Sequence, residues 1–213
     1  MVEQTAVNRW VVGSSPTSGA RNYPKRAFGL FFAILSAMNE IKLVKPTHED
    51  KQAVLEYRDE FFNTHEVIHG SGGLDRLATF EEWLKACEDN EHKDRLAEDR
   101  VPSTQYLAVR QSDGRIVGVI DVRHSLNEFL ETVGGHIGYS VRESERRKGY
   151  ASQMLKLALL RCKEIGIKDV LITCESGNVA SAGVIKANGG VYKKQVETKD
   201  FVKMDNYWIE ITE

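Results

Sequence analysis

The sequence predicts a mixed α/β domain in which one central sheet is flanked by helices. Three segments support this prediction: an apolar strand over residues 136–141, a helix with apolar residues at helical spacing over 150–165, and a buried strand over 170–174. Such a strand–helix–strand connection predicts parallel pairing of its two strands and a right-handed crossover. Upstream, a Ser-Asp-Gly turn signal at 112–114 predicts a hairpin, so the sheet is expected to be mixed.

The other elements follow from local capping, turn and alternation signals, taken in chain order. In the first half we expect a strand over 41–44, a helix capped by Thr47 that runs through Phe61, a glycine-rich break at 70–73, a helix over 79–86, and hairpin strands over 106–109 and 116–122. In the second half we expect a helix from the cap Asn178 to Ala187, a glycine stop at 189–190, and strands over 191–196 and 207–211.

Composition places the chain among globular proteins and excludes several classes of function. With 29 basic and 31 acidic residues, the net charge of −2 argues against a protein built to bind nucleic acid or anionic membranes. No run of 18 apolar residues is present, so no transmembrane helix is predicted. The three cysteines, Cys87, Cys162 and Cys174, are widely spaced, which predicts reduced thiols rather than a disulfide framework or a zinc ribbon.

The first 37 residues differ in character from the rest of the chain. They carry a net charge of +3, whereas residues 38–213 carry −5. They combine a Gly/Ser/Pro-rich loop at 11–20 with an apolar run at 27–38. Three interpretations stay open: a targeting signal, an extension of the mature protein, or a mis-called upstream stretch, with translation starting at Met38. We favour the last, because Gly-Ser-Ser-Pro at 13–16 is what one frame of a transfer RNA arm encodes, and we place the domain at 38–213.

The segment between strand 136–141 and the following helix has the properties of an anion-binding site. The free amides of a first helical turn, together with the positive end of the helix, point at any ligand placed there. Gly149 permits close backbone approach, and Arg147 and Lys148 add positive charge. On residue types alone, a basic surface loop capped by acids remains the alternative.

The run Arg-Arg-Lys-Gly-Tyr-Ala at 146–151 resembles the Arg/Gln-x-x-Gly-x-Gly/Ala signature of GCN5-related N-acetyltransferases, the GNAT family. Residues 38–213 resemble one bacterial subgroup of that family throughout, including the segments at 68–75 and 123–127. The resemblance implies the GNAT acyl-CoA acyltransferase fold, acetyl-CoA as co-substrate without a metal, and a cytoplasmic location. The implied cofactor-binding residues are Val141, Arg142, Arg146, Arg147, Lys148, Gly149, Tyr150, Ala151, Ser152, Asn178 and Ser181.

The resemblance also implies a reaction, the transfer of an acetyl group to a primary amine of a small-molecule or peptide acceptor. No nucleic-acid or membrane partner is implied, and a homodimer is left open. Two positions depart from the family pattern. Ile185 stands where many relatives have a tyrosine that acts as general acid toward the CoA thiolate, and His136 stands where many have a glutamate. The missing tyrosine favours a second function, a CoA-binding regulatory module without turnover.

An attacking amine must lose a proton, so a group that titrates near neutral pH is expected beside the thioester. His136, on the strand face of Gly138 and Ser140, is the first candidate base, and Glu175, after the neighbouring strand, is the second. The alternatives are a structural histidine bonded to a neighbouring strand or loop, and a solvated loop acid.

A competing motif lies at residues 65–69, where His-Glu-Val-Ile-His matches the H-E-x-x-H pattern of zinc metalloproteases and continues to Gly72 and Asp75. Two such histidines share a metal only if they lie one helical turn apart on one face. A glycine-rich break follows directly, so we keep the zinc hydrolase only as a third function. In the acetyltransferase interpretation this loop lies on the acceptor side, and the candidate acceptor-pocket residues are His69, Ser71, Trp83 and His124, with a glycine-rich turn and a core tryptophan as the alternative.

Overall fold

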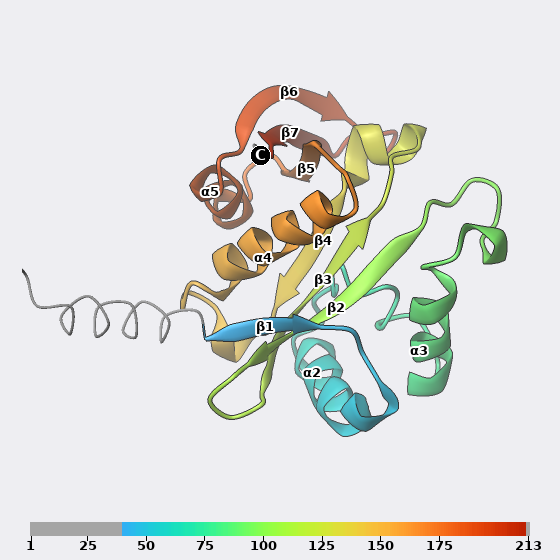
Figure 1. Ribbon diagram of the computed structural model, residues 1–213. Helices are drawn as coiled ribbons and strands as arrows, with labels where there is room; N and C mark the ends of the chain where they lie inside the picture. The colour runs from blue at the N-terminus through green and yellow to red at the C-terminus, as the bar shows by residue number, and fades with distance from the viewer. Residues whose placement is uncertain (1–39, 212–213) are drawn as a thin grey trace, which may run out of the picture. The chain divides into compact units, whose positions relative to one another are not determined.

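Two antiparallel sheets organise residues 40–211, the part of the chain that the computed structural model describes (Figure 1). The strands are β1 (Ile41–Val44), β2 (Ser103–Arg110), β3 (Ile116–Arg123), β4 (Ile137–Val141), β5 (Asp169–Glu175), β6 (Val191–Glu197) and β7 (Lys203–Glu210). The first sheet has the order β1-β2-β3-β4 and the second has the order β5-β7-β6. Helices cover these sheets, so the predicted mixed α/β architecture is confirmed.

Helices pack on both faces of the first sheet and divide its apolar core in two. They are α2 (Lys51–Thr64), α3 (Phe80–Asp89), α4 (Tyr150–Glu164) and α5 (Val179–Ala187), with short helical turns at His48–Asp50, Lys93–Arg95, Leu130–Gly134 and Glu143–Glu145. α4 covers one face, and α2 with α3 covers the other (Figure 1). Strand β2 shows the division, because Ala108 faces the α4 core whereas Leu107 and Val109 face the α2 core.

The strands on either side of α4 meet at one junction only. The backbone N–H of His136 donates to the carbonyl oxygen of Leu171 (2.7 Å), just where β4 begins. No further backbone hydrogen bond joins β4 to β5 within residues 40–211, and the two strands belong to different sheets. The predicted parallel pairing along both strands was therefore wrong. β4 pairs with β3 and β5 pairs with β7, which leaves one edge of β4 without a strand partner.

Local signals placed most helix starts correctly. The Asn178 side chain accepts a hydrogen bond from the backbone N–H of Ser181 (3.0 Å) and caps α5 as predicted. Thr47 and Asp50 hold the chain before α2 through the Thr47 hydroxyl, which donates to the Asp50 carboxylate (2.8 Å). α2 continues to Thr64, slightly beyond the predicted end. The π-helical turn before β4 has no counterpart among the predicted elements.

Within residues 40–211, no helix is both long enough and apolar enough to cross a bilayer. The three interpretations of residues 1–37 concern a segment outside the described residues. They remain predictions, as does the domain boundary at residue 38.

Candidate active site

The loop between β4 and α4 ends on Gly149, which caps α4 with a φ of 84°. That left-handed conformation strains any residue with a side chain, and a Cβ added at Gly149 would meet no heavy atom within 4 Å. The first bond of the α4 ladder runs from the Gln153 N–H to the Gly149 carbonyl (3.2 Å), so the N–H groups of residues 150–152 have no partner inside the helix. These amides and the positive end of α4 form an accessible position for an anion.

Buried Glu145 anchors this loop. Its carboxylate accepts hydrogen bonds from Arg110 Nη1 and Lys148 Nζ, both at 2.8 Å, and Arg115 Nε lies 3.4 Å away. Burial opposes ionisation, but the hydrogen bonds from Lys148 and Arg110 hold the pKa of Glu145 below its ordinary value. Lys148 is therefore committed to the loop, and the neighbouring Arg147 is exposed.

The arginines at the two ends of the loop have side chains with structural partners. Arg142 is buried, and its Nε donates to Glu60 of α2 (2.6 Å). Arg146 Nε donates to the Val141 carbonyl (3.0 Å), and the same guanidinium pairs with Glu66. The side chains of Arg142 and Arg146 thus bind other groups of the protein. A ligand at this site would therefore meet the backbone of the loop and not these guanidinium groups.

Tyr150 and Ser152, in the first turn of α4, also have intramolecular partners. The Tyr150 hydroxyl accepts a hydrogen bond from Arg110 Nη1 (3.2 Å), and the Ser152 hydroxyl accepts one from Asn188 Nδ2 (3.0 Å). Ala151 between them has no polar side chain. The predicted cofactor residues of this turn therefore come together as a row of backbone amides.

The free edge of β4 continues from this loop. Arg142 N–H donates to Val117 of β3 (3.1 Å), so by alternation the backbone groups of Ile137, Tyr139 and Val141 face away from β3. The α5 residues Asn178 and Ser181 reach this side, because the Ser181 hydroxyl lies 3.0 Å from the Tyr139 hydroxyl. The structure thus brings the loop, the β4 edge and the start of α5 together.

His136, the first candidate base, lies at the junction of the two sheets. Its Nδ1 accepts a hydrogen bond from the Leu171 N–H (2.9 Å), which places the proton of the neutral ring on Nε2. Burial, and secondarily the charge of Arg123, lower the pKa of His136. This geometry favours the structural alternative. Glu175, the second candidate, is exposed at the end of β5 opposite Met204.

We expect His136→Ala to destabilise the fold by about 1–3 kcal/mol at neutral pH, because it leaves the buried Leu171 N–H without its acceptor. Folding lowers the pKa of His136, so its stabilising effect is complete above the ordinary histidine value of about 6.5 and declines as the pH falls below it. The variant should accordingly unfold with a weaker pH dependence in mild acid. Urea titrations at several pH values measure this, with His69→Ala, an exposed histidine, as the control.

An unchanged free energy of unfolding in His136→Ala, together with loss of acetyl transfer, would instead support the base.

The predicted acceptor loop lies against β4, on the face opposite α4. The Ser140 hydroxyl donates to the His69 carbonyl (2.6 Å), and Trp83 Nε1 donates to the Ser71 carbonyl (2.7 Å). A Cβ at Gly70 would lie 2.0 Å from the Gly138 carbonyl, so the two backbones touch. Of the predicted pocket residues here, Ser71 and Trp83 are buried and hold the loop, and only His69 is exposed.

His124, the fourth predicted pocket residue, lies at the end of β3. Its Nε2 is 2.9 Å from the Thr104 hydroxyl, and burial lowers the pKa of the imidazole. The side chain is partly buried and is not part of the loop that contains His69. The structure therefore does not bring the four predicted pocket residues together as one surface.

The H-E-x-x-H segment is not helical. α2 ends at Thr64, and His65 adopts a left-handed conformation with a φ of 56°. Glu66 pairs with Arg146 instead of facing a metal position. Within residues 40–211, no three His, Cys, Asp or Glu side chains are grouped so that they could hold a metal ion. The segment lacks the geometry that the zinc interpretation requires.

A family model described as an acetyltransferase (GNAT) domain matches residues 40–191. The chain belongs to the GNAT acetyltransferase family. Among solved structures, the chain is similar to an acetyl transferase from Salmonella typhimurium that modifies the N-terminal serine of ribosomal protein L7/L12, with 20% identity, a TM-score of 0.57 and coverage of 81% of this chain and 96% of that one.

Two further structures share the fold. One is RimL, a ribosomal L7/L12 alpha-N-protein acetyltransferase in complex with coenzyme A, with 18% identity, a TM-score of 0.57 and coverage of 81% and 94%. The other is an acetyltransferase of the GNAT family from Streptococcus pneumoniae, with 14% identity, a TM-score of 0.57 and coverage of 81% and 100%. At these identities the likeness establishes the fold. No curated protein sequence gives a significant match.

In this GNAT domain, the position of the family tyrosine is fully buried. Ile185 has no exposed surface and packs in the α4 core, so it has neither a proton to donate nor access to a ligand. Sequence reasoning missed two residues that shape the site, Glu145 and Tyr139. The acidic residue inside a basic loop was a signal for the first. For the second, the single aromatic residue of β4 was a signal, although nothing in the sequence indicates its contact with α5.

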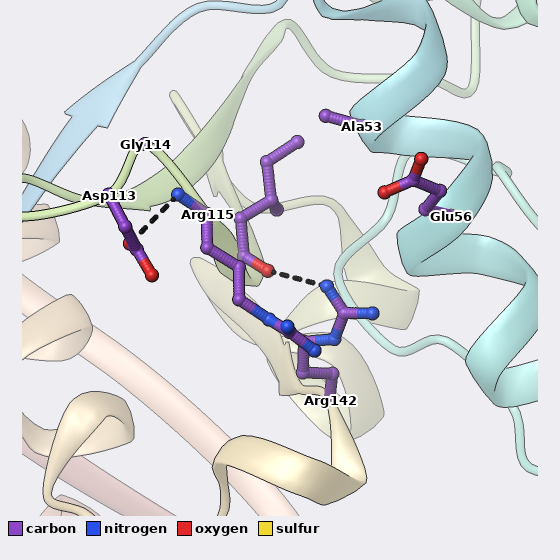
Figure 2. Close-up of a pocket in the computed structure, with 7 residues that line it drawn as sticks. Ala53, Glu56, Asp113, Gly114, Arg115 and Arg142 are labelled. Atoms are coloured by element: carbon purple, nitrogen blue, oxygen red, sulfur yellow. Dashed lines mark hydrogen bonds between the residues drawn. The ribbon is translucent and has the colours of Figure 1, made fainter.

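Two surface cavities lie beside α2. Figure 2 shows the first, of about 360 Å³, where Arg142 Nη1 donates to the Ile116 carbonyl and Arg115 N–H donates to Asp113. The second, of about 510 Å³, combines the aromatic rings of Phe61 and Phe62 with acidic Glu66 and Asp75. Neither cavity is lined by Gly149.

Proposed function

We propose that the protein transfers the acetyl group of acetyl-CoA to a primary amine, by direct attack of the amine on the thioester. The observation that supports this most strongly is the accessible row of amides at the start of α4, next to the free edge of β4. Membership in the GNAT family agrees with it. The amides at 149–152 and the exposed Arg147 would hold the pyrophosphate, and the outward backbone groups of Ile137 and Tyr139 on β4 would pair with the amides of the pantetheine arm.

For acetyl transfer, the main task of the protein is to orient the amine against the thioester. Acetyl-CoA supplies an activated thioester, and holding an amine against it removes most of the entropic barrier. The amine must reach the thioester unprotonated. His136 and Glu175 remain the predicted bases. His136 is the less favoured candidate, because its Nδ1 already accepts a hydrogen bond from the Leu171 N–H.

The acceptor is a small molecule or a peptide that carries a primary amine. The named activities of the Salmonella and RimL structures concern a ribosomal protein terminus, which supports a peptide acceptor alongside a small molecule.

A second candidate function is a CoA-binding module without turnover. Buried Ile185 favours it, because the family's usual proton donor is absent at that position. Turnover decides between the two functions, since both require the cofactor.

We expect the full chain to bind acetyl-CoA with micromolar affinity in a calorimetric titration and to release free CoA thiol when amines are added. The amine panel should include short peptides with free N-termini and small diamines. Binding without thiol release from any amine would favour the regulatory module. Absence of binding by the folded protein would contradict both functions.

A further inference from the structure

A phenol connects β4 to α5. Tyr139 lies in the middle of β4, and its hydroxyl is 3.0 Å from the Ser181 hydroxyl. Asn178 caps α5 and binds the Ser181 N–H (3.0 Å), which fixes the position of Ser181. The phenol therefore spans from the free strand edge to the helix, and its hydroxyl is held at a defined place.

The environment keeps this hydroxyl protonated. Burial raises the pKa of Tyr139 to about 12, with the Ser181 hydrogen bond opposing the change. A phenol with such a pKa stays neutral throughout the physiological range, so it can donate a hydrogen bond without giving up its proton. Ile185, at the position where many family members have a tyrosine, has no hydrogen-bond donor in its side chain and no exposed surface.

The direction of the cofactor follows from the two ends of β4. The anion position at Gly149 lies beyond the C-terminal end of the strand, so an arm along the β4 edge runs back toward the junction at His136 and Leu171. The sulfur at the end of that arm must then lie toward the first half of the strand. Tyr139, at the middle of β4, borders this part of the strand, and its hydroxyl lies next to α5.

We propose that Tyr139 donates a hydrogen bond to the thioester sulfur and stabilises the thiolate as it leaves. In this step the amine nitrogen forms a bond to the carbonyl carbon, the carbon–sulfur bond breaks, and sulfur keeps the electron pair. The proton lost by the amine passes to a base, for which Glu175 and His136 are the candidates, and the Tyr139 proton stays on the phenol. The proposal rests on the proposed acetyl-CoA function and locates the leaving-group stabilisation on β4, with Ser181 as a positioning residue.

The test compares CoA with acetyl-CoA, so that it needs no acceptor. A donor to sulfur lowers the pKa of the bound CoA thiol, and CoA affinity should therefore rise with pH, whereas acetyl-CoA has no thiol to titrate. In calorimetric titrations between pH 6.5 and 8.5, we expect the ratio of CoA to acetyl-CoA affinity to rise about tenfold for the wild-type chain. In Tyr139→Phe the ratio should change less than twofold.

The control is Tyr106→Phe, which removes a partly buried hydroxyl from β2 beside the same core and should keep the wild-type ratio. With an acceptor in hand, Tyr139→Phe should lower kcat about tenfold to hundredfold with little change in the KM for acetyl-CoA. Equal pH profiles for wild-type and Tyr139→Phe would overturn the proposal and leave the phenol as a clamp between β4 and α5. Failure of the wild-type chain to bind either ligand would instead overturn the proposed function.

Discussion

Replacing Gly149 by valine should abolish acetyl-CoA binding while the domain stays folded. The substitution acts on the ligand side, since a Cβ at this position meets no protein atom within 4 Å. The branched side chain would stand over the amides of residues 150–152 and keep a pyrophosphate from reaching them. We expect affinity to fall at least about a hundredfold, as contacts between a phosphate and several charged or oriented donors are lost together.

The chain offers a closely matched control at the other end of the same helix. Gly166 follows α4 with a φ of 83°, and a Cβ there would also meet nothing within 4 Å. Gly166→Val therefore introduces the same backbone strain, about 1–2 kcal/mol, without touching the candidate site. Calorimetric titration and thermal unfolding of both variants separate the two effects.

Similar stability with binding lost only in Gly149→Val is the expected pattern. Retained binding in Gly149→Val would remove the anion position from the α4 terminus. Equal loss of binding in both variants would trace the effect to α4 as a whole.

The sequence predicted those parts of the site whose chemistry lies in adjacent residues. Asn178 caps α5 through the N–H of Ser181, three residues later, and Gly149 provides the left-handed conformation at the end of its own loop. Such signals are local, so they are readable without the fold. The starts of α4 and α5 were predicted for the same reason, whereas β2 and β7 each begin at least three residues before their predicted starts, where no capping or turn residue marks the end.

Side-chain direction could not be predicted, because it depends on distant partners. Arg142, Arg146 and Lys148 were all predicted to bind the cofactor, and Lys148 was expected to add positive charge at the loop. In the structure, however, their partners are Glu60, Glu66 and Glu145. The first two partners come from α2 and the loop after it, more than 80 positions earlier in the sequence for Arg142. The sequence shows that basic residues are present, but it does not show which acidic residues of other segments will pair with them.

The separation of β4 and β5 was likewise beyond the sequence pattern. A strand–helix–strand unit predicts parallel neighbours, and the two strands do meet where Gly135 passes Leu171 so closely that a Cβ would lie 2.6 Å from the Leu171 carbonyl. Beyond that point each strand is satisfied by an antiparallel partner on its other side. The candidate cofactor site follows from the edge of β4 that this leaves without a strand partner.

Arg142→Met should produce the largest loss of stability of the variants considered. Arg142 is buried, its Nη2 lies 2.6 Å from Glu60, and its Nη1 donates to the Ile116 carbonyl (3.1 Å). Removing the guanidinium leaves the partly buried Glu60 carboxylate with Arg115, 3.9 Å away, as its remaining cation, and leaves the Ile116 carbonyl without this donor. Breaking such a pair from one side typically costs about 3–5 kcal/mol, and the partial exposure of Glu60 places the expected loss at the lower end.

The double variant Glu60→Gln with Arg142→Met distinguishes loss of the pair from loss of packing. With no carboxylate left unpaired, urea unfolding should show the double variant to be more stable than Arg142→Met alone. Hydrogen bonds from Ser144 and Arg142 outweigh burial and lower the pKa of Glu60, so its contribution is present above the unfolded value of about 4.3 and is lost as the pH falls. The stability difference between Arg142→Met and wild type should therefore shrink in acid.

The same variant tests where the cofactor meets the end of β4. Because the Arg142 side chain faces α2, its loss should leave acetyl-CoA affinity within about twofold under conditions where the variant is folded, less than a single good hydrogen bond contributes. A tenfold loss of affinity at full folding would mean that the guanidinium leaves Glu60 to reach the phosphates. A loss of less than 1 kcal/mol in stability would mean that the pair is as dispensable as a surface salt bridge. The buried position of Arg142 and its two partners argue against both outcomes, and they make α2 part of the scaffold that holds the cofactor loop in place.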